Sequence, residues 1–208
     1  VKWRSNFLNA NEGLPLKNIA LLIKNKIQKG EVVITHFGIE GNAIYALSPE
    51  IQNELESIGI SKVLIDFKPT LSKDLVLKKL NTSKQNISKT LKDILKLPKP
   101  GIDLLKQSLS KDEFLDLPNL AQHIKSFPIE IIGSAPIEEV ISTSGGIELK
   151  AIKNSFEFKQ LNNQYCIGEM LDWDAPTGGY LVQGCASSGV YLAKQLNKLV
   201  QNDSGIEE

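Results

Sequence analysis

The spacing of apolar residues changes twice along this 208-residue chain. Short apolar runs at residues 32–34 and 62–67 predict strands, because β-branched and aromatic residues dominate them. Between the two runs, Ser48 as N-cap and Pro49 as first helical residue predict a helix, which Gly59 ends. The first part of the chain is therefore expected to be rich in β-structure.

From residue 72 to about residue 127 the apolar period becomes helical. Pro98, Pro100 and Pro118 divide this stretch into several helices, since proline is poorly tolerated inside a helix. We expect residues 71–127 to form a compact helical insert that can be separated from its flanking strands. The apolar positions that carry the period are Leu75, Leu77, Leu80, Ile87, Leu91, Ile94, Leu95, Leu104, Leu105, Leu109, Leu120 and Ile124.

Beyond Pro128 the pattern becomes extended again. Residues 129–132 and 139–143 read as strands, residues 156–158 as a hairpin partner, and residues 164–167 as the end of a buried strand. The fold class expected is α+β, a β-rich domain interrupted by helices and followed by a strand-turn-helix. Its parts are 1–70 and 128–159 for the β-rich domain, 71–127 for the insert and 160–208 for the last unit.

A glycine-rich turn is expected to open the last helix. Pro176 halts any helix before it, and Thr177 can cap the new one. Its first amides would then come from Gly178, Gly179 and Tyr180, and such amides have no partner within the helix. Together with the helix dipole they favour an anion or an electron-rich oxygen in front of them. Two glycines at a helix start are also compatible with an ordinary turn.

The residues before that turn place two carboxylates at a bend. Gly168 lets the backbone leave the predicted strand sharply, and Glu169 and Asp172 follow it. The helix beyond has small residues in its middle, from Gly184 to Gly189, and should therefore lie close to a neighbouring strand or backbone. The alternatives are solvated carboxylates and a buried C-terminal helix.

Two further loops combine small residues with a preceding strand. Thr35, His36 and Gly38 lie in one, Gly145 and Gly146 in the other, and this composition permits close approach by a planar ligand. Two ordinary turns with glycine at positive φ would explain the same residues. His36 could donate a proton or act as a structural hydrogen-bonding group. No catalytic acid or base can be assigned.

Three segments resemble one family when read in order. Residues 168–189 contain Gly-Glu-Met-Leu-Asp, then Thr-Gly-Gly-Tyr and Ser-Ser-Gly; residues 35–41 read Thr-His-Phe-Gly-Ile-Glu-Gly; residues 142–147 read Ser-Thr-Ser-Gly-Gly-Ile. They resemble the aminoacetone-oxidase-like, or BaiN-type, bacterial FAD-dependent oxidoreductases. The chain departs from the usual family motifs at Glu40, Asn42 and Ser144.

The resemblance implies a flavoprotein that transfers hydride through FAD, with NAD(P)H as a possible electron donor and a small organic molecule as substrate. It implies that Gly178, Gly179 and Tyr180 donate amides to the flavin, and that Glu169 and Asp172 accept from its hydroxyl groups. Thr35, His36, Gly38, Gly145 and Gly146 are then expected to face flavin or substrate. Residues 160–208 would be the end of a Rossmann-type FAD-binding domain, with Gly168 and Thr177 in the cofactor site.

The expected nucleotide-binding half is not in this sequence. No Gly-X-Gly-X-X-Gly turn occurs, the chain begins at Val1, and Met170 is its single methionine. We therefore expect a C-terminal half whose partner is the missing N-terminal FAD-binding half. Alone it should be inactive and should not retain FAD. The alternative is a non-catalytic protein-interaction module.

The distribution of charge and the two cysteines indicate which partners and which cellular compartment to expect. Residues 62–106 hold eleven Lys and four Asp but no Arg, with Phe67 as their single aromatic residue. We interpret this block as a solvated face, with no nucleic-acid or membrane partner. Cys166 and Cys185 read as structural thiols of a cytoplasmic protein, with neither a metal site nor a disulfide expected.

Overall fold

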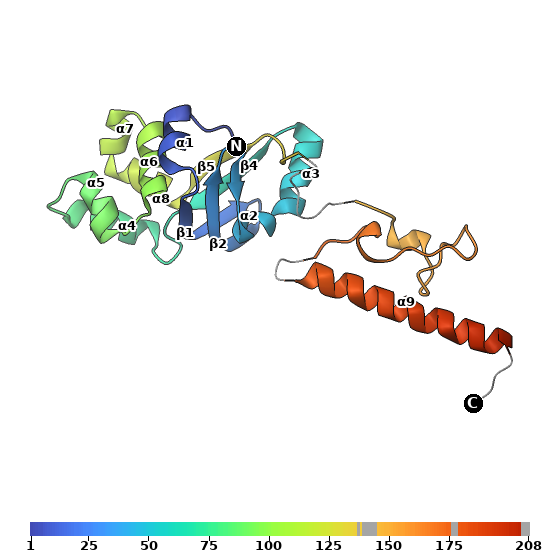
Figure 1. Ribbon diagram of the computed structural model, residues 1–208. Coiled ribbons are helices and arrows are strands. Elements are labelled where there is room, and N and C mark those ends of the chain that lie inside the picture. The colour runs from blue at the N-terminus through green and yellow to red at the C-terminus, as the bar shows by residue number, and fades with distance from the viewer. Residues whose placement is uncertain (137, 139–144, 176–178, 205–208) are drawn as a thin grey trace. The chain divides into compact units, whose positions relative to one another are not determined.

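The computed structural model describes residues 1–136, 138, 145–175 and 179–204. The chain divides into two compact units, residues 1–135 and 136–208, and each is described by itself (Figure 1). The sequence analysis placed a boundary after residue 159 instead. The difference arises because residues 147–158 pair locally with residues of the second unit, through isolated bridges such as Ile147 with Leu171 and Glu157 with Tyr165.

The first unit is built on a five-stranded sheet in which all neighbouring strands are antiparallel. The strand order is β3-β2-β1-β4-β5, so that the first strand of the chain lies at the centre. Helices occur both before and after β4 along the chain, and together with the antiparallel sheet they confirm the α+β class. The strands are β1 Pro15–Ile23, β2 Lys26–Thr35, β3 Gly38–Glu40, β4 Ser61–Asp66 and β5 Phe127–Ile131.

The central strand β1 has an irregularity that hides it in the sequence. Its register against β2 shifts between Leu16 and Ile19, and Asn18 has a φ of 56°. A β-bulge of this kind places two residues opposite one and breaks the alternation of apolar and polar positions. The sequence analysis identified parts of β2, β4 and β5 but not β1 or β3.

Helices precede, follow and interrupt the strands. One prediction about them was wrong in detail: Ser48 is the first residue of α3 rather than its N-cap, because the carbonyl of Leu47 already accepts from the amide of Ile51. Gly59 does end this helix, with a φ of 76°. The helices are α1 Ser5–Asn11, α2 Asn42–Tyr45, α3 Ser48–Ile58, α4 Lys73–Thr82, α5 Ile87–Lys89, the π-helix η1 Thr90–Ile94, α6 Lys99–Ser108, α7 Lys111–Leu115 and α8 Leu117–Lys125.

The helices between β4 and β5 share one core with the sheet. Phe67, which is 1% exposed, packs against Phe127 with ring centroids 5.7 Å apart, and a Cβ added to Gly101 in α6 would lie 3.1 Å from its ring. The same buried cluster includes Leu91 and Leu105 from the helices and Ile65 from β4. Residues 71–127 are helical as expected, but they have no core of their own from which the strands could be separated.

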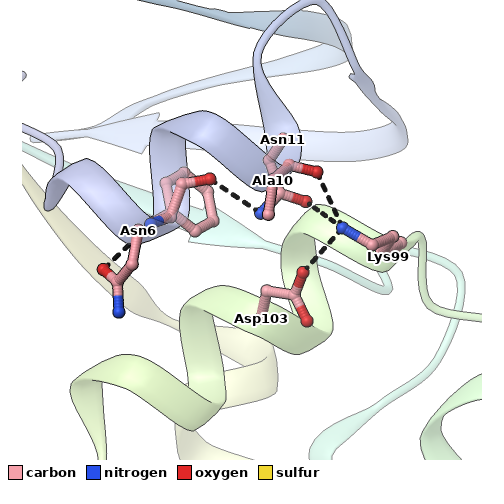
Figure 2. A network of polar contacts seen from close by, with 6 residues as sticks. Asn6, Ala10, Asn11, Lys99 and Asp103 are labelled. Atoms are coloured by element: carbon pink, nitrogen blue, oxygen red, sulfur yellow. Dashed lines mark hydrogen bonds and ion pairs between the residues drawn. The ribbon is translucent and has the colours of Figure 1, made fainter.

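A polar network joins α1 to α6 (Figure 2). The ammonium group of Lys99 donates to the carbonyl of Ala10 at 2.8 Å, to Oδ1 of Asn11 at 3.1 Å and to Asp103 at 3.0 Å. Asn11 is 1% exposed and donates in turn to the carbonyl of Phe7. A cation at the carboxyl end of a helix satisfies free carbonyls and opposes the dipole, so Lys99 holds the end of α1 on α6.

The second unit contains little regular structure before its long helix. Its described elements are the 3-10 turns η3 Leu149–Ala151 and η4 Gly168–Met170 and the helix α9 Tyr180–Ser204. Residues 164–167 do not form the predicted strand; Tyr165 makes one bridge and Cys166 is buried. The strand predicted at residues 139–143 lies outside the described residues. No helix in the described part of the chain combines the length and apolarity needed to span a bilayer.

Candidate functional site

The loop predicted at residues 35–41 is the tight turn between β2 and β3. Thr35 pairs with Gly38, and His36 and Phe37 form its tip with ring centroids 3.8 Å apart. Gly38 has a φ of 144°, and its carbonyl accepts from Nε1 of Trp3 at 2.8 Å. Glycine is therefore needed here for the backbone geometry of the turn, as the simpler interpretation of this loop proposed.

The tip of this turn borders a hollow of about 510 Å³ in the first unit. Its lining includes Trp3, His36, Phe37 and Ser134, which mixes aromatic rings with polar groups. Nδ1 of the exposed His36 lies 3.4 Å from a carboxylate oxygen of Glu12, and the hydroxyl of Thr35 is buried with no hydrogen-bond partner among the described residues.

In the second unit, two segments that the sequence placed in separate loops lie against each other. The amide of Ile147 donates to the carbonyl of Met170 at 2.9 Å, and the amide of Asp172 donates to the carbonyl of Ile147 at 2.9 Å. A Cβ added to Gly146 would lie 2.8 Å from the carbonyl oxygen of Met170. Gly146 is thus required for close backbone contact, and the loop of Gly145 and Gly146 is joined to the bend after Gly168.

Gly168 connects this bend to α9. Its amide donates to the hydroxyl of Ser188 at 3.2 Å, and its carbonyl accepts from Nε1 of Trp173 at 2.8 Å. The indole of Trp173 covers Gly184, where an added Cβ would come within 2.5 Å of the ring. The small residues of α9 therefore permit the close approach that the sequence predicted. Trp173 fills this contact inside the unit.

The remaining predicted cofactor residues are open to solvent. Glu169, Asp172 and Tyr180 are exposed. Gly179 is also exposed, has a φ of 87°, and a Cβ there would meet no atom within 4 Å. Its carbonyl accepts from the amide of Gln183, so that α9 begins at Tyr180 and Gly179 precedes the helix instead of lying within it.

Thr177 and Gly178 lie outside the described residues, and so does Thr143. The predicted residues thus fall into two groups: Thr35, His36 and Gly38 in the first unit and the others in the second. Among the residues the structure describes, no group of three or more His, Cys, Asp or Glu side chains could hold a metal ion.

The sequence analysis missed the residues that complete the hollow. Trp3, Leu8 and residues 132–134 come from the two ends of the first unit, more than 120 positions apart. One signal was present: Trp3 and Phe7 are four residues apart, a spacing that places side chains together on a helix, and their rings are 5.1 Å apart. Nothing in the local sequence linked them to residue 36.

The cysteines differ in environment. Cys166 is fully buried, and this burial raises the pKa of its thiol. Cys185 is half-buried on α9 beside Gly168. Both are free thiols in this structure, and the raised pKa of Cys166 makes that residue a poor nucleophile.

Comparison with known proteins agrees with the resemblance found in the sequence. The chain is 29% identical over 203 residues to a Haemophilus influenzae protein named ribosomal RNA dihydrouridine synthase. The match covers 92% of this chain and 48% of that protein, so the chain spans about half the length of its curated relative. Residues 1–142 match the model described as the HI0933-like protein barrel and H2TH domain, and the chain belongs to this family of flavoproteins.

Proposed function

We propose that this chain is part of a FAD-dependent oxidoreductase and that its second unit contributes to the flavin site. The observation that carries the proposal is the contact between residues 145–147 and 170–172. The bend that contains residues 170–172 begins at Gly168, which contacts α9 at Cys185 and Ser188. These segments match the family motif separately in the sequence, yet they are hydrogen-bonded neighbours in space. A shared ligand is a physical reason for two separate glycine-containing segments to meet at one place.

The exposed residues of the second unit that the sequence assigned to the cofactor have chemistry that suits a flavin. Gly145 and Gly179 have positive φ, and a Cβ at either would meet no atom within 4 Å. Gly179 precedes and Tyr180 begins a 25-residue helix, whose dipole favours electron-rich oxygens near their amides. Glu169 and Asp172 expose carboxylates that can accept hydrogen bonds from hydroxyl groups. Bound FAD would supply a two-electron carrier, which these residues would orient.

For the substrate, the name of the Haemophilus influenzae relative favours a uracil base in ribosomal RNA. Converting uridine to dihydrouridine adds one hydride and one proton across the C5–C6 double bond, with NAD(P)H as the source of the hydride. This proposal replaces the small organic substrate and the exclusion of nucleic acid that the sequence analysis favoured. A small organic substrate remains the alternative.

The flavin site is tested in the complete protein. Gly179→Val should lower the flavin content, because a branched side chain is strained at a φ of 87° and would project toward the ring. Asp172→Ala should weaken FAD binding by about 1–3 kcal/mol, the contribution of a hydrogen bond to a charged group. Flavin absorbance and reduction by NADPH measure both effects. Gly189→Ala, in the same helix beside Ile167, is the control.

If Gly179→Val and Asp172→Ala both retain full flavin and normal reduction, the turn has only a structural role and the proposal fails. The substrate is tested separately, by mass spectrometry of ribosomal RNA from cells that lack the complete gene. Loss of dihydrouridine, restored by the wild-type gene, supports the RNA substrate. Unchanged dihydrouridine favours the small organic substrate.

The isolated 208-residue chain should be colourless after purification and desalting. Affinity for FAD comes from both ends of the ligand, and a chain that spans half of its relative offers part of these contacts while the cost of ordering the ligand remains. Stoichiometric flavin in the purified chain would contradict this expectation. A complete protein that contains no flavin at all would instead favour the non-catalytic interaction module.

A further inference from the structure

The two edges of the five-stranded sheet border the same hollow. Three strands lie between β3 and β5 in the sheet, and in a flat sheet these edges would be about 19 Å apart. Phe37, in the turn before β3, and Ile132, directly after β5, nevertheless both line the hollow of about 510 Å³. The sheet therefore curls, in agreement with the barrel of the family description, and the hollow lies at the gap between its edges.

Trp3 is held firmly at this hollow. Its Nε1 donates to the carbonyl of Gly38 at 2.8 Å, and its ring centroid lies 5.1 Å from that of Phe7, which is 1% exposed. These contacts fix the indole through its polar group and through its ring, while the side chain stays half-buried. A flat ring that is already fixed in the free protein loses little conformational freedom when a ligand stacks on it.

A second aromatic surface lies at the tip of the turn between β2 and β3. The rings of His36 and Phe37 have centroids 3.8 Å apart, and Phe37 is 40% exposed. Nδ1 of His36 lies 3.4 Å from a carboxylate oxygen of Glu12, whose neighbour Gly13 donates its amide to the carbonyl of Ile34 in β2. The tip is thus attached to the end of α1 as well as to the strands, and Nε2 of His36 is left for a further hydrogen bond.

Polar groups complete the lining of the hollow. The exposed Lys2 and Ser134 come from the two ends of the first unit. An ammonium group binds phosphate as a point charge, and a hydroxyl group can donate to or accept from the edge of a base. Aromatic faces, hydrogen-bonding groups and a cation are together what proteins use to bind an unpaired nucleotide.

A peptide strand matches these sheet edges less well. Addition of a strand requires a run of free backbone donors and acceptors along the edge. β3 has three residues, and the carbonyl of Gly38 at its start already accepts from Trp3. Pro128 removes one donor from β5. The side chains around the gap are therefore a better basis for recognition than its backbone.

We propose that this hollow binds one unpaired base of RNA, with Trp3, His36 and Phe37 as the stacking surface and Lys2 at an adjoining phosphate. The choice of RNA rests on the proposed function, in which a uracil base of ribosomal RNA is the substrate. Enzymes that modify a base take it or its neighbours out of the helical stack, and stacking on protein rings offsets that loss. His36 is thereby assigned to the substrate and not to the flavin.

The first test maps the site in the wild-type 208-residue chain. A short single-stranded oligouridylate with one central 4-thiouridine is irradiated with long-wavelength ultraviolet light, and the crosslinked peptides are identified by mass spectrometry. Crosslinks should fall on Trp3, His36 or Phe37, and an excess of unlabelled oligouridylate should suppress them. Crosslinks confined to other segments would overturn the proposal, and so would the absence of any binding.

The second test separates stacking from apolar contact, with Kd measured by fluorescence anisotropy. Phe37→Leu should weaken binding about tenfold, because it removes an aromatic face on which a base can stack. Phe37→Tyr retains that face and should remain within about threefold of wild type. Lys2→Gln should lower the magnitude of the slope of log K against log salt by about 0.7, the contribution of one phosphate contact on a single strand.

The matched control is Ile27→Ala, which removes an apolar side chain that is 64% exposed in β2 and does not line the hollow. Its Kd should equal that of wild type, and the melting temperatures of all variants check that they are folded. An unchanged Kd in Phe37→Leu, or an equal loss in Ile27→Ala, would overturn the proposal. Equal losses in Phe37→Leu and Phe37→Tyr would do the same, because stacking would then not be the cause.

The complete protein distinguishes this site from the proposed function. There Phe37→Leu should raise KM for RNA more than it lowers kcat. If the wild-type complete protein forms no dihydrouridine but the chain still crosslinks at the hollow and depends on Phe37, the substrate proposal fails and the base-binding site stands. Dihydrouridine formation with an unaltered KM in Phe37→Leu would leave the substrate proposal intact and overturn the hollow as its RNA site.

Discussion

The two units differ in how much apolar surface they bury for themselves. Residues 1–135 enclose a cluster of 29 buried apolar residues that runs from the sheet into the helices. In the described part of residues 136–208, three buried residues form the core, Ile152, Cys166 and Leu171. Because burial of apolar surface must offset chain entropy, the first unit has the core that an independently folding domain needs, whereas the described part of the second unit has a much smaller one.

The helix α9 of the second unit leaves several apolar side chains exposed. Val182, Val190 and Leu199 are each more than 50% exposed, and Tyr191 packs edge-on against Phe156 while remaining largely open. A long helix with apolar residues on its exposed side is typical of an element that packs against further chain. A relative twice as long is consistent with this interpretation.

The largest effect is expected when the units are separated. Residues 1–135 alone should unfold cooperatively in urea, because their core is complete, while residues 136–208 alone should show no cooperative transition. Circular dichroism during urea titration, with near-ultraviolet signals as a second probe, distinguishes the two. A cooperative transition in the second unit would show that its few buried residues suffice.

The next effect tests whether helices and strands of the first unit share one core. Phe67→Ala should lower the free energy of unfolding by about 3–5 kcal/mol, since its ring contacts both Phe127 and α6. Ile58→Ala, at a 70% exposed position of α3, is the control and should cost less than about 1 kcal/mol. Replacement of residues 72–126 by a flexible linker should abolish cooperative unfolding altogether. A folded sheet in that variant would instead support the prediction that residues 71–127 are a separable insert.

A smaller effect is expected in the second unit. Gly184→Ala places a Cβ 2.5 Å from the indole of Trp173, which is tethered by its hydrogen bond to Gly168. The clash should destabilise the unit by about 1–3 kcal/mol. Gly189→Ala, where the nearest side-chain atom is 3.8 Å away, should instead be neutral or stabilise by up to about 1 kcal/mol through helix propensity. Thermal unfolding of the 208-residue chain compares the pair, and equal effects would contradict the packing of Trp173 on Gly184.

The smallest effect is expected in the pH dependence of the stability of the first unit. The hydroxyl of Ser61 donates to Glu54 at 2.8 Å and lowers the pKa of this carboxyl below its ordinary value of 4.5, assisted by the amide of Lys62 and the charge of Lys24. A lowered pKa stabilises the fold above the ordinary value, and the contribution is lost as the pH falls through the lowered pKa. Wild type should therefore be more stable than Glu54→Gln at pH 6, and the difference should disappear toward pH 3. If the difference in stability between wild type and Glu54→Gln stays the same from pH 6 to pH 3, the lowered pKa of Glu54 does not contribute to stability.

Local sequence was sufficient to predict a residue's structural role wherever that role depends on its immediate neighbours. Gly59 ends α3 and the small residues of α9 permit close packing, because backbone geometry and side-chain volume are local properties. The helical character of residues 71–127 followed from the 3.6-residue period in the same way. The family resemblance added the glycine motifs, which are also contiguous.

Tertiary structure decided what depends on residues distant in sequence. The bulge at Asn18 concealed β1, and its central place in the sheet follows from pairing with both β2 and β4. Trp173 meets Gly184, and Gly146 meets residues 170–172, across intervening stretches of chain whose local sequence does not indicate these contacts. The amino-acid sequence indicated most of the helices and parts of three strands, whereas long-range packing decided which segments touch, because periodicity contains no information about partners across the chain.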